Sequence, residues 1–361
     1  MKRAKDFLKR STEAGKPFFL YFNYSMLHLP TIPRAEFKGK TGHGDWADSL
    51  LEMDTDFGEL LDYLKSLGVE DNTIVVFSGD NGPEEMAPWR GTGGCFDGSY
   101  FTGMEGSLRT PAIVRYPGHV PAGQKSNEIV HITDLFTTLI LWAGLEIPRD
   151  RVIDGVDQRA FFEGKQPNSN REGFLYWMGD ALYGVKWRNF KMVLVLQKTL
   201  SDPALHLTTP HLINLDTDPK EREPYDYPYI HTWVGAQTGG KTATTQKGTT
   251  TRPNIVYILA DNVGWGDFSC YGGSLPTPRI DKLASEGIRF NNYTIESQCT
   301  PTRTAIMTGR QSVRCGTYTV VPGQGTACHR VYHARPTEAH FCLKTNEPQR
   351  MSDSSITHCA R

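Results

Sequence analysis

The chain has 361 residues, of which 38% are hydrophobic and 22% charged, and its 39 lysines and arginines against 40 aspartates and glutamates give a formal net charge of -1. This length suffices for one large domain or about two ordinary ones. A chain without an overall basic field is a poor candidate for binding nucleic acid or an anionic membrane surface. No apolar run approaches the roughly 18 to 20 residues of a membrane-spanning helix, and the charged opening segment lacks the apolar core of a secretion signal. We therefore expect no membrane partner and, for the chain as written, no export.

The cysteines are unevenly distributed. Residues 1–269 contain only Cys95, whereas residues 270–361 contain the other six. An odd total concentrated near one end argues against a regular set of disulfides.

The first third of the chain alternates between strand and helix patterns. Residues 17–24 form an apolar, aromatic run typical of a buried strand. Residues 48–67 carry apolar side chains at the spacing of one helix face, and Gly68 follows as a natural end. Residues 72–77 form a β-branched run without polar alternation, as in a parallel strand covered on both faces, and residues 109–117 suggest a further strand. This order predicts an α/β fold.

The next segment changes character. Residues 129–144 have the pattern of an amphipathic helix. Beyond them, short apolar runs separated by polar turns predict a small, mainly antiparallel subdomain at about 151–234. Residues 235–252 contain seven Thr, four Gly, no acidic residue and no aromatic residue, which is the composition of a flexible linker.

Strand and helix patterns resume after the linker. Residues 253–259 form a second continuous apolar run, a candidate central parallel strand. A helix is predicted over 277–287, with Thr277 as N-cap and a proline in its first position, and a shorter helix over 301–309. From about residue 321 neither period is visible, so we expect disorder over 321–361.

Two of the predicted strands end in the same way. Asp80-Asn81 and Asp261-Asn262 each follow a buried strand directly, at the edge where open α/β sheets bind ligands. Two carboxylates and two amide carbonyls would form an oxygen-only site that suits Ca²⁺ or Mg²⁺ better than Zn²⁺. A single Asp-Asn-Gly is more often only a turn, so this prediction depends on the two pairs lying together.

A cysteine and an arginine form the third candidate element. Pro301 in the first helical position would place Cys299 just ahead of a helix N-terminus, where the dipole favours an anion and lowers a thiol pKa. Arg303, one turn later, could bind an oxyanion through two N–H groups. The cysteine loop of phosphatases needs an arginine six positions after the cysteine, where Ala305 stands, so that interpretation fails. A buried cysteine beside an arginine salt bridge remains an equal alternative.

The segment C-x-P-x-R followed by T-G-R, from Cys299 to Arg310, resembles the signature of type I sulfatases (arylsulfatases), in which an enzyme oxidises the cysteine to formylglycine. Residues 253–267 and 277–290 resemble the rest of the amino-terminal third of these enzymes. The resemblance to the middle and carboxyl-terminal parts of the same enzymes lies in residues 18–30, 80–82, 105–118, 132–148 and 154–165. The resemblance implies an alkaline-phosphatase-like fold, with a largely parallel central sheet flanked by helices and a small, mainly antiparallel subdomain.

The order of these portions differs from that of the family, in which the formylglycine segment comes first. The chain resembles either a circular permutation or a fusion of two sulfatase fragments, with these parts: 1–234, middle and carboxyl-terminal portion; 235–252, linker; 253–320, amino-terminal portion; 321–361, a disordered or frame-shifted tail. A flexible linker of this length spans about 23 Å on average and about 60 Å at most, enough to return across a domain. The strand at 254–259 can thus lie beside that at 72–77 in one molecule.

The resemblance also implies roles for individual residues. A cation, Ca²⁺ or alternatively Mg²⁺, would be held by Asp261, Asn262, Asp80, Asn81 and the formylglycine derived from Cys299. Arg303 would fix the formylglycine and its sulfate, and His28 would contact the ester or the leaving alcohol. Without the resemblance, His28 is more simply a loop histidine before a proline. Asn262 stands where many relatives have a second Asp, which should weaken cation binding.

The implied function is hydrolysis of a small-molecule sulfate ester after modification by a formylglycine-generating enzyme; relatives are often periplasmic or secreted. The family's Gly-Lys-x-His segment and a lysine shortly before Glu105, both sulfate contacts, are missing, so the rate should fall by orders of magnitude. The alternatives are a phosphodiester or phosphonate ester hydrolase of the same superfamily and a non-enzymatic fusion fragment. A zinc site in the tail is disfavoured by cysteine spacings of 14 and 17.

Overall fold

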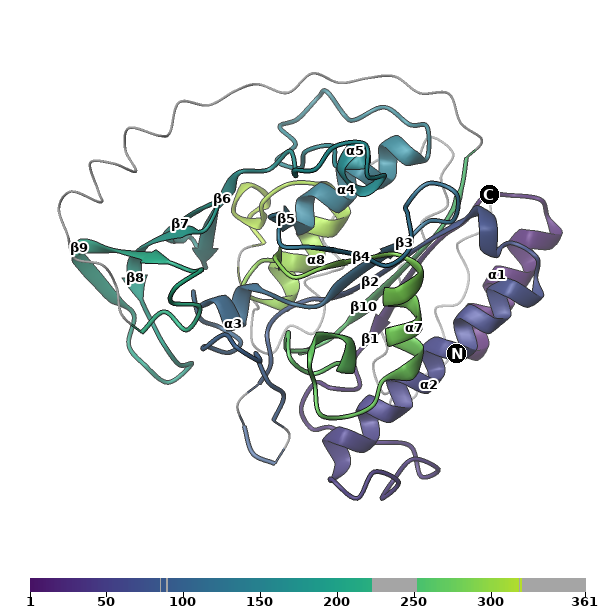
Figure 1. Cartoon of the computed structure of the whole chain (residues 1–361), viewed down its shortest axis with the longest axis horizontal. Coiled ribbons are helices and arrows are strands. Elements are labelled where there is room, and N and C mark those ends of the chain that lie inside the picture. Colours follow the sequence, from purple (N-terminus) through teal and green to yellow (C-terminus); the bar gives the residue numbers. More distant parts are fainter. Residues whose placement is uncertain (85, 89, 223–251, 318, 320–361) are drawn as a thin grey trace, which may run out of the picture.

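The computed structural model describes residues 1–84, 86–88, 90–222, 252–317 and 319, and it has a six-stranded central sheet between two layers of helices (Figure 1). The strand order is β1-β10-β2-β3-β11-β4. The bounds are β1 Phe19–Tyr24, β2 Thr73–Gly79, β3 Ala112–Arg115, β4 Gln124–Ser126, β10 Asn254–Ala260 and β11 Ile288–Phe290. The predicted α/β class, with a mainly parallel central sheet, is confirmed.

Strand β10 lies at the centre of the parallel part of the sheet. It pairs in parallel with β1 on one side and with β2 on the other, with Ile258 opposite both Phe22 and Phe77. Every residue of β10 and of β2 is buried, as expected for apolar strands covered on both faces. The predicted neighbourhood of the strands at 254–259 and 72–77 is therefore confirmed. Strand β3 runs antiparallel to both β2 and β11.

The two faces of the sheet are covered by different helices. Val75 and Phe77 share a hydrophobic cluster with α1 (Lys2–Glu13), α2 (Asp45–Ser66) and α7 (Pro278–Glu286). Ile74 and Val76, which point to the opposite face, share theirs with α4 (Ile132–Trp142), α5 (Arg159–Phe162) and α8 (Cys299–Thr308). Short 3₁₀ turns occupy η1 Glu70–Asn72, η2 Ser269–Tyr271 and η3 Ser312–Cys315.

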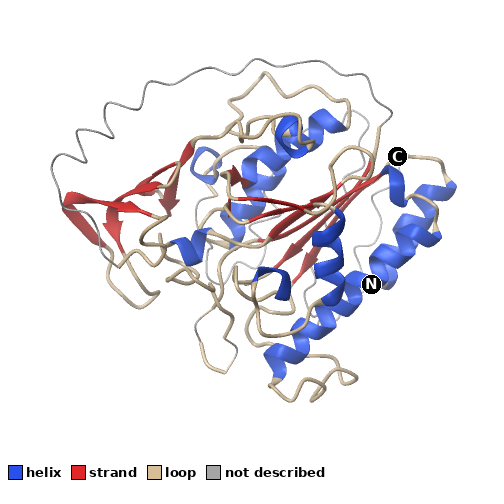
Figure 2. Ribbon diagram, in the orientation of Figure 1, coloured by secondary structure: helices blue, strands red, loops and turns tan. Residues whose placement is uncertain are grey.

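A separate four-stranded antiparallel sheet stands at one side of the molecule (Figure 2). Its strands are β6 Gly173–Met178, β7 Ala181–Trp187, β8 Phe190–Leu196 and β9 Leu205–Asn214. This agrees with the mainly antiparallel character predicted after residue 150. Lys186 of β7 and Lys191 of β8 reach the carboxylate of Glu105 in α3 (Glu105–Leu108), which joins this sheet to the central unit. A further pair joins β5 (Val130–His131) to β12 (Tyr293–Thr294).

Some predicted boundaries need correction. Helix α8 begins at Cys299, with Gln298 as its N-cap, so the predicted start at 301 is wrong and Pro301 is the third helical residue. Thr277 is the N-cap of α7, as predicted. The linker up to residue 251 and the tail from residue 321 lie outside the described residues. Among the described residues, none of the helices combines the length and apolar character that a membrane crossing requires.

Candidate active site

The two Asp-Asn pairs lie side by side at the carboxyl edge of the central sheet. They follow β2 and β10, and the register of these strands sets Gly79 opposite Ala260 immediately before them. The Asp80 backbone N–H donates to the carbonyl of Ala260 at 3.1 Å, and the Asn262 N–H donates to Oδ1 of Asp80 at 3.2 Å. The Asn81 side-chain Nδ2 donates to Oδ1 of Asn262 at 2.5 Å. The pairing predicted from the sequence is present.

Arg303 connects the two carboxylates. Its Nη2 lies 2.6 Å from Oδ2 of Asp80 and 3.0 Å from Oδ2 of Asp261, and its Nε lies 3.2 Å from the same oxygen of Asp80. Helix α8 delivers this side chain one turn after Cys299, and all these groups are largely buried. In this structure the guanidinium is thus held by the carboxylates of Asp80 and Asp261.

The acidity of Cys299 differs from the prediction. Burial, together with the negative charges of Asp80 and Asp261, raises the pKa of the Cys299 thiol to about 12 against the opposing charge of Arg303. The predicted lowering by the helix N-terminus is therefore wrong, because desolvation and two nearby carboxylates outweigh the dipole. An unmodified thiol here stays protonated near neutral pH and is a poor nucleophile.

Several buried oxygens at this edge lack a hydrogen-bond donor. Within the described residues, Oδ1 of Asn81, Oδ1 of Asp261 and Oε2 of Glu84 have no partner. Burial and the charge of Asp261 also raise the pKa of Asp80 to about 7, against the lowering effect of Arg303. Unpartnered carboxylate and amide oxygens beside crowded negative charge fit a hard cation with oxygen ligands. No cluster of three or more His, Cys, Asp or Glu side chains suited to a metal occurs in the described part of the chain.

His28 lies on the exposed side of the same edge, on the loop that follows β1. Burial of part of the ring lowers its pKa, but the charges of Asp261, Glu84 and Asp80 and the carbonyl of Leu29 raise it overall. Its Nδ1 lies 2.8 Å from the Leu29 carbonyl, which leaves Nε2 for other partners. The structure thus brings His28 within electrostatic reach of the paired carboxylates.

The sequence interpretation missed two residues of this site. The Oε1 of Glu84 accepts a hydrogen bond from Nδ2 of Asn262 at 2.6 Å, and its place two residues after the Asp-Asn-Gly turn could have drawn attention to it. Burial raises the pKa of Tyr100, and the charges of Cys299, Asp80 and Asp261 raise it further, so its phenol lies near them. No motif marks Tyr100 in the sequence.

Comparisons with protein families agree with this architecture. The sulfatase family model matches residues 1–145 and 253–337. A second model, described as the carboxyl-terminal part of N-sulphoglucosamine sulphohydrolase, matches residues 91–229.

Individual relatives and a solved structure are also similar. N-acetylgalactosamine-6-sulfatase of Canis lupus familiaris is 34% identical over 250 residues, covering 63% of this chain and 48% of the relative. Human steryl-sulfatase is 29% identical over 249 residues, covering 61% and 42%. The crystal structure of the PsFucS1 sulfatase from Pseudoalteromonas sp. superposes with a TM-score of 0.59 at 28% identity, covering 65% of this chain and 50% of that one. The chain spans about half the length of the curated relatives it matches. Since the sulfatase model matches more than half of its residues, the chain belongs to the sulfatase family.

Proposed function

We propose that this chain is a sulfuric ester hydrolase whose nucleophile derives from Cys299. The observation that supports this most directly is the meeting of Cys299 and Arg303 with the strand-end carboxylates Asp80 and Asp261 at one sheet edge, in a chain of the sulfatase family. Sulfatases are named among its relatives, which makes a small-molecule sulfate ester the expected substrate class.

The proposed nucleophile is the formylglycine that an oxidising enzyme would form from Cys299. Its hydrate supplies one hydroxyl to attack the sulfur and a second by which sulfate is released. The environment of Cys299 suits such a group better than a thiolate, since burial and two carboxylates keep the thiol protonated. Arg303 lies one helical turn away, where it would hold the sulfate oxygens as charge builds on them.

His28 is the proposed proton donor. The raised pKa shifts the ring toward its protonated form, and the Leu29 carbonyl occupies Nδ1. Nε2 would then deliver a proton to the oxygen of the departing alcohol or phenol.

The two Asp-Asn pairs are the proposed cation ligands, with Ca²⁺ as the first candidate and Mg²⁺ as the alternative. The unpartnered Oδ1 atoms of Asp261 and Asn81 are the oxygens best placed for this role, because Arg303 engages the Oδ2 atoms of the two aspartates. A bound cation would stabilise negative charge on the nucleophilic oxygen.

We expect this activity to be weak. The sequence contains neither the Gly-Lys-x-His segment nor the lysine shortly before Glu105 through which relatives hold sulfate. Loss of such preorganised charge costs orders of magnitude in rate.

Mass spectrometry and a paired assay test the proposal. The chain is co-expressed with a formylglycine-generating enzyme, and the peptide containing Cys299 is examined for the aldehyde, with Cys95 as the internal control for non-specific oxidation. Turnover of an aryl sulfate and of the matching aryl phosphate is then measured with and without Ca²⁺. An aldehyde at Cys299 and calcium-dependent cleavage of the sulfate support the proposal. Preferential cleavage of the phosphate would favour the phosphoester hydrolase, and an unmodified thiol without turnover would favour a non-enzymatic fusion fragment.

We also infer that the sulfatase portions occur in permuted order within one folded unit. The position of β10 between β1 and β2 supports this, because a segment after the linker then completes the sheet of the segment before it.

A further inference from the structure

Tyr100 lies on a loop that is fastened to two parts of the candidate active site. Its backbone N–H donates to the carbonyl of Pro83 at 3.1 Å, just after the Asp-Asn pair that follows β2. The next amide, that of Phe101, donates to the carbonyl of Ser297 at 3.4 Å, shortly before Cys299. The loop therefore joins one of the two strand ends to the segment that leads into α8.

The backbone of this loop is strained next to Tyr100. Phe101 has a φ of 66°, in the left-handed region that a bulky side chain rarely adopts. The ends of the loop pack closely, because a Cβ on Gly98 would stand 2.2 Å from the Cβ of Met104. Such strain persists only where the surrounding contacts enforce it, and it is concentrated at functional sites. The loop thus holds Tyr100 in a defined place at the cost of some stability.

The phenol of Tyr100 lies among the charged groups of the site and is only partly buried. Burial raises its pKa, and the negative charges of Cys299, Asp80 and Asp261 raise it further. A tyrosine hydroxyl is protonated at neutral pH even without such effects. At this place the side chain therefore supplies an O–H donor that carries no charge.

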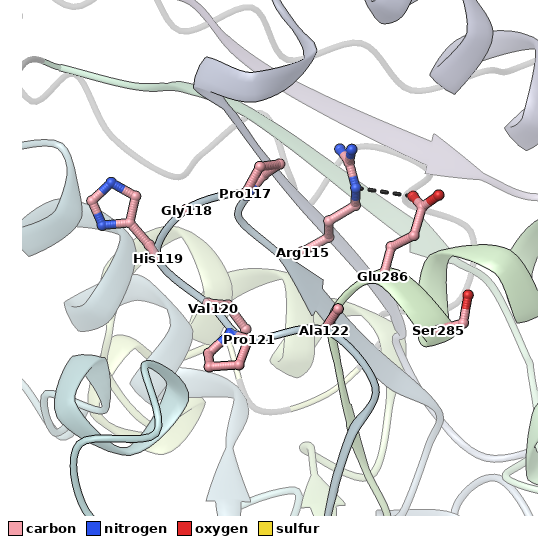
Figure 3. A pocket seen from close by; sticks show the side chains of 9 residues that line it. All are labelled: Arg115, Pro117, Gly118, His119, Val120, Pro121, Ala122, Ser285 and Glu286. Carbon is pink, nitrogen blue, oxygen red and sulfur yellow. Dashed lines mark ion pairs between the residues drawn. The ribbon is translucent and has the colours of Figure 1, made fainter.

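The opposite end of the sheet shows what two carboxylates do to an arginine. A cavity of about 510 Å³ lies there, where Arg115 of β3 is opposite the first part of β2 (Figure 3). Arg115 contacts Glu286 at 3.0 Å and Glu70 at 2.8 Å, which neutralise it. Arg303 is engaged by two carboxylates in the same way at the candidate site. A guanidinium shared in this manner attracts a bound anion less than a free one does, so a further donor matters there.

We propose that Tyr100 is a specificity-determining residue, whose phenol donates a hydrogen bond to the tetrahedral group of the substrate and favours esters with a single negative charge. This inference rests on the proposed hydrolase function. A sulfate monoester and a phosphodiester each carry one negative charge, whereas a phosphate monoester carries nearly two at about pH 8. The phenol adds no attraction for the second charge, and the carboxylates of Asp80 and Asp261 repel it.

The test measures calorimetric binding of three probes with the same aryl group: the aryl sulfate, the aryl phosphate and the diaryl phosphate. The chain is expressed without a formylglycine-generating enzyme, so that Cys299 keeps its thiol, and binding is measured at about pH 8 with Ca²⁺. Tyr100→Phe keeps the ring and removes the hydroxyl, and Tyr100→Lys places a cation at the same position. The matched control is Tyr63→Phe, in α2. Thermal melting checks that each variant is folded.

The expected changes differ between the two variants. Tyr100→Phe should weaken binding of the aryl sulfate about tenfold, because a hydrogen bond to a charged group is lost. Tyr100→Lys should shift the ratio of affinities about tenfold toward the aryl phosphate, since an ammonium attracts its second charge. Tyr63→Phe should leave both quantities within about twofold of wild type.

The outcomes separate this inference from the proposed function. The two expected changes support it even if Cys299 is never modified and no sulfate is cleaved. Unchanged binding of the aryl sulfate by Tyr100→Phe, or no binding by wild type, overturns it even if the modified chain hydrolyses that ester. An unchanged ratio of affinities in Tyr100→Lys overturns the selection by charge. If the modified chain cleaves the diaryl phosphate and not the aryl sulfate, the sulfatase activity is refuted, while the two binding changes still support the role of Tyr100.

Discussion

Removing the charge of Glu105 should destabilise the protein strongly. Glu105 is fully buried in α3, where its carboxylate accepts hydrogen bonds from Nζ of Lys186 at 2.6 Å and from Nε of Arg109 and lies 3.3 Å from Nζ of Lys191. Burial by itself raises the pKa of this carboxyl, but the three cations hold it well below the usual range. In the variant Glu105→Gln all three buried cations lose this carboxylate. Within the described residues, the acidic partner that remains to them is Glu221, which pairs with Lys191.

The size of the effect follows from the burial. Removing one partner of a buried ion pair costs about 3–5 kcal/mol, because the remaining charge is left in a medium of low polarity. A typical domain has a free energy of unfolding of about 5–15 kcal/mol, so the loss is a large fraction of the total. At about 2–4 °C per kcal/mol for a protein of this size, Tm should fall by roughly 6–20 °C.

Urea unfolding followed by circular dichroism measures this loss. The matched control is Glu172→Gln, which breaks an exposed pair with Arg188 and should change the free energy of unfolding by less than about 1 kcal/mol. The folded pKa of Glu105 lies below its ordinary value of 4.5, so its contribution is present above that pH and is lost as the pH falls further. The gap between wild type and Glu105→Gln should therefore narrow in acid. A variant within about 1 kcal/mol of wild type at pH 7 would refute the reasoning.

Two further predictions concern the candidate site and its surroundings. Glu84→Gln removes the charge beside Asn262, so the rise in Tm on adding Ca²⁺ should require about three- to tenfold more calcium. The control is Glu146→Gln, which makes the same change at an exposed position. An unchanged calcium titration of Glu84→Gln would count against a role for Glu84. Burial raises the pKa of Asp267 to about 7 despite two backbone hydrogen bonds. Its contribution to stability is then complete below the unfolded value of 3.8 and is lost as the pH rises through about 7. The free energy of unfolding of wild type should fall between pH 4 and 7 relative to Asp267→Asn, and parallel urea profiles would contradict this.

The strands that carry the site could be predicted from sequence because their signal is local. Continuous apolar runs mark β2 and β10, and the polar pair after each marks the strand end. Strand β7 has a weaker local signal, because Lys186 is fully buried at a position where a strand pattern requires an apolar residue. Its partner, Glu105, lies 81 residues away, so no local pattern reveals the compensation. The same reason explains the error at Cys299, whose acidity depends on carboxylates supplied by distant strand ends.

The last prediction concerns the proposed permuted order of the sulfatase portions within one folded unit. If β10 is an integral strand of the sheet, its amides and those of β2 should exchange hydrogen with the same free energy of opening, because both depend on global unfolding. Ile258 is 1% exposed and lies between Phe22 and Phe77, so Ile258→Ala should lower protection in both strands by about 2–5 kcal/mol. Leu205→Ala, at a side chain that is 57% exposed, is the control and should leave both unchanged. Hydrogen exchange measured by mass spectrometry resolves the two strands as separate peptides. Loss of protection confined to β10 would mean that the portions before and after the linker fold independently, and the permuted single unit would have to be abandoned.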